Sequence, residues 1–243
     1  MPRFLLPPEA WGAETAVLTG EEAKHASQVL RVRRGDKVTV FDGEGRSANA
    51  EVLDVSRHEL RLRLGEQRQR EVSKPTMVLA QAVTKGKTMD LIVQKAVELG
   101  VSRIQPLLTR HAVVQLDDED AEKKASKWQR VALEACKQCG QDRVPRVDAP
   151  VDFRPWLANS GSGLRLIASL AEGAQPLKKI LREREEAPDE VVLLVGPEGD
   201  FSAIETREAL AAGFLPVSLG DIVLRAETAA FFVLAAVRYE YAV

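Results

Sequence analysis

The chain has 243 residues, of which 45% are hydrophobic and 29% are charged, and its formal net charge at pH 7 is −2. This length and apolar content suffice for packed cores in one large domain, or in a large and a small one, and they exclude a disordered chain. The near-neutral charge excludes a strongly basic protein that coats nucleic acid with its whole surface, so any nucleic-acid contact must come from local clusters.

The first residues of the chain indicate neither a membrane span nor a secretory signal. The apolar patch of Phe4, Leu5 and Leu6 is followed by two prolines. No window approaches the roughly 18 apolar residues that cross a bilayer. We therefore expect a cytoplasmic protein with no membrane partner.

Residues 1–70 predict a small antiparallel β-barrel. Between Lys37 and Leu64, apolar and polar residues alternate in short runs, which is typical of half-buried strands. Glycine-containing turn sequences at 33–36 and 42–45 separate these runs. The polar stretch 66–75 that follows has neither the strand nor the helix period, and it predicts a linker to a second domain.

Residues 75–243 predict an α/β domain, because apolar runs typical of buried strands alternate there with helical patterns. We expect strands at 77–83, 104–108, 164–168, 191–195 and 215–219, and helices at 89–99, 119–139, 176–186, 202–212 and 226–241. This alternation predicts a parallel sheet. Ligands of such sheets bind beyond the carboxyl ends of the strands.

Two motifs in this domain are compatible with a metal site. Cys136 and Cys139 have C-x-x-C spacing, but a second ligand pair is absent from the sequence and both thiols lie near a predicted helix C-terminus, which disfavours thiolates. The acidic run 117–120 lacks the spaced ligands and glycine of a calcium loop. We therefore expect reduced, structural cysteines, an acidic helix start and no metal.

A glycine-containing loop follows the strand expected at 191–195. Ser202 and Glu205 have the spacing of a capping box, which predicts a helix start at Ala203. Gly196 and Gly199 allow the backbone of this loop to approach a ligand closely. A lone Gly-x-x-Gly is equally compatible with a simple chain turn.

A second loop has the same organisation and makes the ligand interpretation stronger. The strand expected at 215–219 runs through Gly220 into the apolar helix expected at 226–241. Two such loops at neighbouring strand ends can form the walls of one cofactor site. The pair therefore predicts a cofactor-binding site at this edge of the sheet.

The residues of these two loops closely resemble the ribosomal RNA small subunit methyltransferase E family of the SPOUT class. The matching segments are 196–199, 219–220 and 223–229, with further matches at 95–101, 104, 106, 134–139, 143, 145, His25, 29–31, 35–36 and 42–43. The resemblance therefore covers nearly the whole chain. One position departs from the family pattern, because Asp200 stands where the family usually has a second glycine. Aspartate tolerates a left-handed backbone better than most other non-glycine residues.

The resemblance implies an S-adenosylmethionine-dependent enzyme that methylates N3 of a uridine in 16S ribosomal RNA, uridine 1498 in the usual rRNA numbering, to give 3-methyluridine. It implies a front domain similar to the RNA-binding PUA domain, a rear domain with a deep trefoil knot, and a homodimer that acts on the small ribosomal subunit. Bottom-up topology rules would reject a knot, so that expectation depends on the resemblance alone.

The same resemblance implies the residues of the site. The expected cofactor-binding residues are Leu170, Val195, Gly196, Glu198, Gly199, Leu219, Gly220, Val223, Leu224, Glu227 and Thr228. Arg225 is the expected catalytic residue, because a guanidinium can donate to a uracil carbonyl and stabilise the anion that forms when N3 loses its proton. The alternative role for Arg225 is a structural ion pair with Glu227 or Glu198. The general base stays open among Glu198, Glu205 and Glu227.

A cationic group of the front domain and a basic loop of the rear domain are the expected RNA contacts. The residues are Arg3, Lys24, His25, Arg31, Arg33 and the adjacent Arg34 in the front domain, and Lys85 and Lys87 in the rear domain. The alternative is a solvated basic face, with His25 as a core residue.

Two other functions explain part of the pattern. A non-catalytic RNA-binding or ribosome-assembly factor would use the same front domain but would need no cofactor loops. A nucleotide-dependent oxidoreductase would need a glycine fingerprint after the first strand of the α/β domain, which residues 83–87 do not supply. Lys85 to Thr88 also lack the earlier glycine of a phosphate-binding loop.

Overall fold

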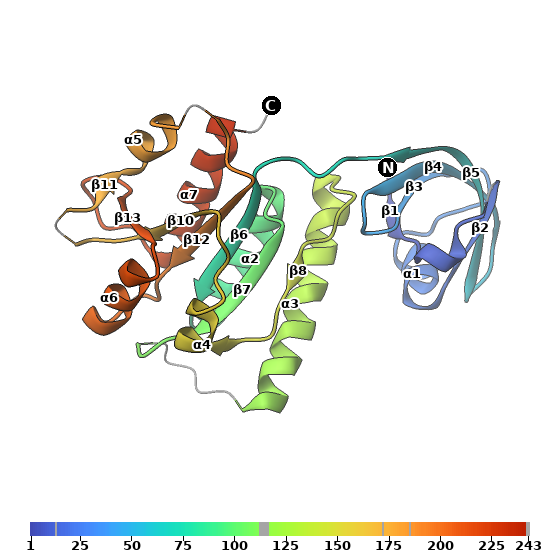
Figure 1. The fold of residues 1–243 in the computed structure, drawn as a ribbon. Coiled ribbons are helices and arrows are strands. Elements are labelled where there is room, and N and C mark those ends of the chain that lie inside the picture. Colours follow the sequence, from blue (N-terminus) through green and yellow to red (C-terminus); the bar gives the residue numbers. More distant parts are fainter. Residues whose placement is uncertain (13, 112–116, 172, 185, 242–243) are drawn as a thin grey trace. The chain divides into compact units, whose positions relative to one another are not determined.

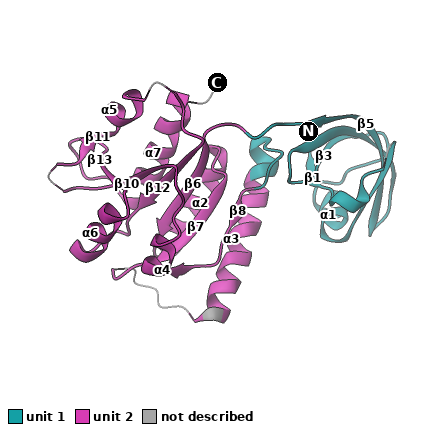
Figure 2. Ribbon diagram, in the orientation of Figure 1, with its two compact units in different colours: residues 1–72, 136–144 teal, residues 73–135, 145–243 magenta. Residues whose placement is uncertain are grey.

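The computed structural model describes residues 1–12, 14–111, 117–171, 173–184 and 186–241, and the chain forms two compact units (Figures 1 and 2). Unit 1 comprises residues 1–72 and 136–144, and unit 2 comprises residues 73–135 and 145–243. The first unit ends within the predicted linker. It also includes a second segment, 136–144, for which the sequence carries no local signal.

Unit 1 is built on a five-stranded sheet with the strand order β1-β3-β4-β5-β2. The strands are β1 (Arg3–Leu5), β2 (Thr15–Thr19), β3 (Lys37–Phe41), β4 (Arg46–Val55) and β5 (Glu59–Gln69). The pairs β3–β4, β4–β5 and β2–β5 are antiparallel, whereas β1 is parallel to β3. Among the described residues this pairing is an open path with one parallel pair, so the predicted small antiparallel β-barrel is a half-barrel.

The core of unit 1 follows the alternation seen in the sequence. Val38 and Val40 of β3 are fully buried, as are Leu60 and Leu62 of β5. Two helical segments that the barrel prediction did not include, α1 (Gly20–Lys24) and η2 (His25–Val29), follow β2 and bury alanines in the same core. The predicted hairpin turn is present between β3 and β4, where the Asp42 carboxylate accepts the amide N–H groups of Glu44 and Arg46 at 2.7 and 3.0 Å.

Unit 2 contains an eight-stranded sheet in which every pairing is parallel, as predicted. Its order is β11-β13-β10-β12-β6-β7-β8, and β9 pairs with β7. The strands are β6 (Thr76–Ala82), β7 (Arg103–Leu108), β8 (Arg146–Val147), β9 (Val151–Asp152), β10 (Leu164–Ala168), β11 (Gln175–Pro176), β12 (Glu190–Val195) and β13 (Leu215–Ser218). All five predicted strands are confirmed, and the unpredicted strands have two residues each, too few to show a period.

Helices cover both faces of this sheet (Figure 1). They are α2 (Thr88–Glu98), α3 (Asp118–Cys139), α4 (Phe153–Leu157), α5 (Leu177–Arg182), α6 (Ala203–Ala211) and α7 (Ala226–Tyr241). On one face, α4 and α6 pack around Phe153 and Phe201 against Val192 and Leu194 of β12. Helices α2 and α7 pack together, and α7 also contacts β6 and β12. In the described part of the chain, no helix combines the length and hydropathy needed to cross a membrane.

Candidate functional site

The predicted cofactor residues lie at one edge of the unit 2 sheet. Strands β13, β10, β12 and β6 are neighbours and all run in the same direction, so the loops that follow them lie side by side. The segment 195–199 follows β12, and 219–224 leads from β13 toward α7. Leu170 follows β10, and Glu227 and Thr228 lie in the first turn of α7.

The loop after β12 is tightly packed. A Cβ atom at Gly196 would lie 3.1 Å from Oδ1 of Asp200 and 3.3 Å from the ring of Phe201, so a side chain would force the loop open. Asp200 has a φ of +58°, in the left-handed region. Its carboxylate accepts the N–H of Phe201 at 2.7 Å, and its own N–H donates to the Pro197 carbonyl at 3.0 Å. These bonds explain how aspartate adopts a conformation that favours glycine.

A buried glutamine that the sequence analysis did not identify forms hydrogen bonds to the start of this loop. Gln81 near the end of β6 is fully buried. Its Nε2 lies 3.1 Å from the carbonyl of Ala82 and 3.4 Å from the carbonyls of Val195 and Gly196. These three carbonyls are all acceptors, so the amide nitrogen faces them. The signal in the sequence was one polar residue inside the apolar run 77–83.

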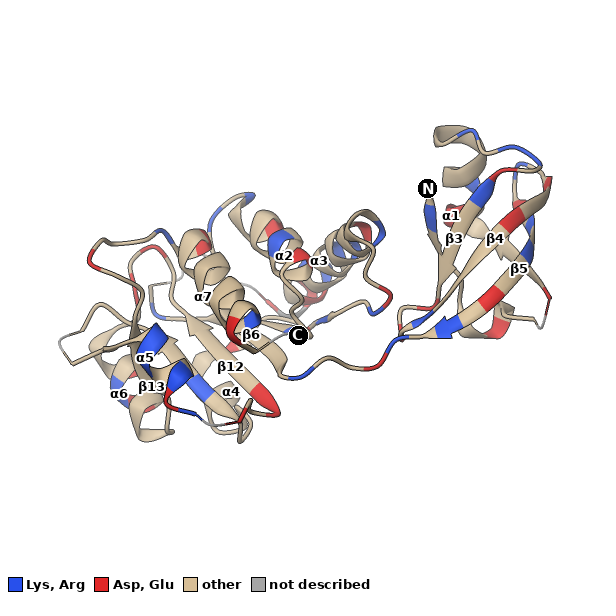
Figure 3. Ribbon diagram, turned by 90° about the horizontal axis from the view of Figure 1, so that it is seen from above, with Lys and Arg blue, Asp and Glu red and all other residues tan. Residues whose placement is uncertain are grey.

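Exposed basic and apolar side chains lie on these loops and beside them. Lys85 and Lys87 are exposed in the loop before α2, which is blue in Figure 3. The N–H of Lys85 lies 3.5 Å from Oε1 of Glu198 and so joins this loop to the one after β12. Leu170 and Val223 are 65% and 76% exposed, so two neighbouring loops present apolar side chains to solvent.

Arg225 is exposed and immediately precedes α7. In the described part of the chain, its side chain forms no ion pair with Glu227 or Glu198, so the structural alternative for Arg225 has no support. Its backbone carbonyl accepts the N–H of Ala229 at 2.8 Å, which attaches the residue to the first turn of α7.

The comparisons with known proteins agree with this geometry. The model of an RNA methyltransferase domain matches residues 71–238, and the model of an RNA methyltransferase PUA domain matches residues 18–65. Ribosomal RNA small subunit methyltransferase E from Synechocystis is 31% identical over 93% of this chain and 74% of its own length. The chain belongs to the ribosomal RNA small subunit methyltransferase E family. This confirms the resemblance and the predicted methyltransferase class.

Solved structures of relatives extend over nearly the whole chain. The family member from Neisseria gonorrhoeae, solved bound to S-adenosyl methionine, is 32% identical, with a TM-score of 0.88 over 99% of this chain and 98% of its own. A methyltransferase from Legionella pneumophila, solved in complex with the bound cofactor SAM, is 33% identical, with a TM-score of 0.89 over 98% and 97% of the two chains.

Glu205 is one of the three candidate general bases, and its carboxylate already forms hydrogen bonds in the N-terminal cap of α6. The predicted capping box is confirmed: the Glu205 carboxylate accepts the N–H and hydroxyl of Ser202 at 2.8 and 2.7 Å and the N–H of Arg110 at 2.8 Å. Burial raises the pKa of Glu205, but these hydrogen bonds outweigh it and hold the pKa below its ordinary value. A carboxylate with these bonds is a poor proton acceptor, and the capping role is sufficient to explain Glu205.

The basic residues predicted for unit 1 differ in how available they are. Lys24, Arg31 and Arg33 are exposed, and His25 is half-buried at the start of η2. Arg3 has only 15% of its side chain exposed. Its guanidinium pairs with Asp142, donates to the Gln141 carbonyl at 3.1 Å and lies over the Phe41 ring. These contacts commit Arg3 to the packing of unit 1.

The cysteines are free thiols in different environments. Cys136 is buried at the end of α3, and Cys139 is exposed. Burial, together with the neighbouring Cys139, raises the pKa of Cys136 to about 12, so this thiol stays protonated near neutral pH. Among the described residues, no group of three or more potential ligands could hold a metal ion. Asp117 accepts the N–H of Asp120 at 2.8 Å, so the acidic run begins α3 as predicted.

Proposed function

We propose that this protein transfers a methyl group from S-adenosylmethionine to N3 of a uridine in 16S ribosomal RNA, uridine 1498, and so forms 3-methyluridine. The observation that carries the proposal is the set of adjoining loops after β10, β12 and β13 in a chain of this family. Relatives of about one-third identity were solved with S-adenosylmethionine bound.

The residues at these loops fit such a cofactor. Gly220 has a φ of +132° and open space where a side chain would be, so its backbone is accessible to a ligand. The exposed side chains of Leu170 and Val223 are suited to cover an adenine ring or an aliphatic chain. We assign cofactor binding to Leu170, Val195, Gly196, Glu198, Gly199, Leu219, Gly220, Val223, Leu224, Glu227 and Thr228. When bound, the cofactor supplies an electrophilic methyl group on a sulfonium.

The chemistry required of the protein concerns the uridine. Its N3–H must lose a proton before or while the new N–C bond forms, and the negative charge spreads to the two uracil carbonyls. Arg225 donates hydrogen bonds to one of these carbonyls and so stabilises the anion. Glu198 and Glu227 are the remaining candidates to accept the proton.

The return of the chain from β13 supports a trefoil knot in unit 2. β13 lies two strands from β12 in the sheet order, with β10 between them. The next element, α7, nevertheless packs on β12, β6 and α2. The chain therefore returns past β10 after β13, and this return is compatible with the knotted crossing that we propose.

The apolar exposure of α2 and α7 supports a homodimer. Leu91 on α2 and Phe232 on α7 are 41% and 47% exposed, and these two helices are neighbours. For RNA binding we propose Lys24, His25, Arg31, Arg33, Lys85 and Lys87, and we leave out Arg3 because its guanidinium is already paired.

We also propose that the enzyme acts in the cytoplasm, where ribosomal subunits assemble.

The proposal is tested by incubating the protein and labelled S-adenosylmethionine with small ribosomal subunits from a strain that lacks the endogenous activity, followed by nucleoside analysis of the RNA. Labelled 3-methyluridine is the expected product. Label in another nucleoside would overturn the target while keeping the methyltransferase. Absence of both label and cofactor binding would favour a non-catalytic RNA-binding factor.

A further inference from the structure

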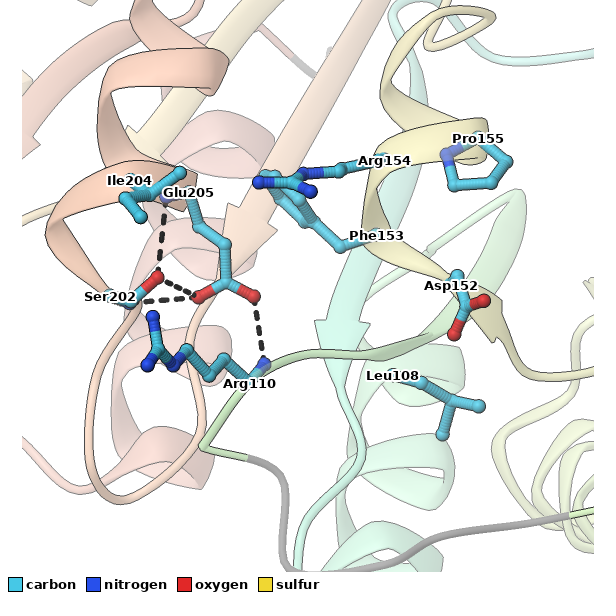
Figure 4. A pocket seen from close by; sticks show the side chains of 9 residues that line it. All are labelled: Leu108, Arg110, Asp152, Phe153, Arg154, Pro155, Ser202, Ile204 and Glu205. Carbon is cyan, nitrogen blue, oxygen red and sulfur yellow. Dashed lines mark hydrogen bonds between the residues drawn. The ribbon is translucent and has the colours of Figure 1, made fainter.

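A second hollow lies in unit 2, outside the residues assigned to the cofactor. This cavity of about 360 Å³ is bounded by the end of β7, the start of α4 and the first turn of α6 (Figure 4). The residues that matter to the argument are Leu108, Arg110, Asp152, Pro155, Ile204 and Glu205. Its volume falls in the roughly 300–1,000 Å³ range of sites for small molecules.

The rim of the cavity carries an available positive charge. Arg110 is exposed, and within the described part of the chain its guanidinium has no ion pair. Its backbone N–H donates to Glu205, so the residue is attached to the N-terminal turn of α6. The other cation, Arg154, pairs with Glu208 at 3.0 Å. Arg110 is therefore the group best placed to receive an anion.

One short segment, Arg110 and His111, joins the cavity to the loop after β12. His111, which follows Arg110, places its Nδ1 3.2 Å from the carbonyl of Gly199 and 3.0 Å from that of Asp200. The same short segment thus borders the cavity on one side and the loop after β12 on the other. The two sites therefore lie on either side of this segment.

The walls suit a flat, mostly apolar group with a polar edge. Pro155 and Ile204 are exposed and Leu108 is half-buried, and all three line the cavity. The exposed carboxylate of Asp152 can accept hydrogen bonds from amino or imino groups on the edge of a base. Apolar walls, one free carboxylate and one free guanidinium together match the base and phosphate of a single nucleotide.

We propose that this cavity receives one unstacked nucleotide that flanks the target uridine. Its phosphate binds Arg110, and its base lies against Leu108, Pro155 and Ile204. Proteins read single-stranded RNA through bases splayed out into such sites. This inference rests on the proposed function, because it assigns a further part of the same RNA substrate.

Three variants test it in the full-length protein. Arg110→Ala removes the phosphate contact, and Ile204→Trp fills the cavity without changing the charge. Arg207→Ala is the matched control. Arg207 is an exposed arginine of α6, the helix that also carries Ile204, and its side chain donates to the Ala203 carbonyl outside the cavity. Binding of unmethylated small ribosomal subunits is measured by sedimentation, and S-adenosylmethionine affinity and methyl transfer are measured in parallel.

We expect Arg110→Ala and Ile204→Trp each to weaken subunit binding by about tenfold, as for loss of one good RNA contact. S-adenosylmethionine affinity should stay unchanged in both, and Arg207→Ala should match the wild type. Wild-type subunit binding by both cavity variants would overturn the proposal. If the wild type binds subunits without methylating them, the proposed function fails, and the binding measurement still decides the role of the cavity.

Discussion

Arg225 carries the chemical part of the proposed reaction, since it is exposed beside the loop after β13 and has no ion pair among the described residues. We expect Arg225→Ala to lower kcat by about 100-fold, the usual effect of removing one donor that stabilises a developing anion. S-adenosylmethionine affinity should change by less than about twofold, because the guanidinium acts on the uridine. Single-turnover methyl transfer and calorimetric binding measure the two quantities.

The conservative variant separates charge from geometry at this position. Arg225→Lys keeps the positive charge but loses the planar fork of donors, so partial activity is expected. Wild-type turnover in Arg225→Ala would remove this residue from the mechanism.

Gln81 is expected to position the cofactor loop, because its buried amide donates toward the carbonyls of Val195 and Gly196. Gln81→Leu leaves these carbonyls without their donor, at a cost of about 1–3 kcal/mol. The loop should then be less well ordered for binding, and S-adenosylmethionine affinity should fall by about tenfold. Isothermal calorimetry measures this affinity.

β7 offers a matched control for Gln81. Gln105 is also a buried glutamine, and its Nε2 donates to the carbonyls of Pro106 and Ala149 at 2.9 and 3.0 Å, away from the cofactor loops. Gln105→Leu should lower the melting temperature without changing cofactor affinity. An equal loss of affinity in the two variants would mean that Gln81 contributes only to general stability.

Among the helices, α6 has an N-terminus whose stability depends on pH. The hydrogen bonds to Glu205 lower its pKa below the ordinary value of 4.5. The ionised carboxylate is therefore favoured by folding: its contribution is complete above pH 4.5 and is lost as the pH falls through the lower, folded-state pKa. We expect Glu205→Gln to have a lower melting temperature than the wild type at pH 7, and this difference to narrow at pH 3.

Circular dichroism at the two pH values measures this effect, and Ser202→Ala provides a second probe of the same cap. It should cost about 1 kcal/mol, because the helix loses one N-terminal hydrogen bond. A difference between Glu205→Gln and the wild type that is the same at pH 3 and pH 7 would contradict the assigned role of the charge.

The sequence predicted well those strands and helices whose formation is determined by residues close together in the sequence. Buried parallel strands are continuous apolar runs, so β6, β7, β10, β12 and β13 were readable. Helix ends were readable where a chemical signal marks them, as at Ser202 for α6 and at Gly140 after α3. Alanine-rich packing of α1 and η2 carries no such signal, and the barrel prediction omitted both segments.

Features that depend on contacts distant in sequence were not predictable. Residues 136–144 belong to unit 1 through pairs such as Lys137 with Glu22 and Arg3 with Asp142. Arg3 was assigned to RNA from its charge alone, whereas its partner lies 139 residues away. The roles of Gln81 and Arg110 likewise depend on hydrogen bonds to a strand end and a helix far along the chain. The cofactor loops were predicted from two glycine-containing loops at strand ends, and the family resemblance then supplied their individual residues.

At the scale of the whole chain, the charge distribution limits how RNA can be bound. The net charge is −2, and β4 and β5 each carry residues of both signs (Figure 3). Many of these strand charges neutralise each other, as in the pairs of Arg61 with Glu59 and Arg63 with Glu51. Arg31 and Arg33 precede β3 and have no ion pair in the part of the chain that the structure describes, so we expect them to supply most of the phosphate contacts of unit 1.

The double variant Arg31→Gln/Arg33→Gln should weaken binding to small ribosomal subunits and flatten its dependence on salt. Each lost phosphate contact removes about 0.7–0.9 from the slope of log affinity against log salt concentration, so the slope should fall by roughly 1.5. Arg61→Gln/Arg63→Gln removes the same charge from paired positions and should leave the slope near the wild-type value. Equal slopes for the two double variants would show that net charge, and not this surface, governs the binding of RNA.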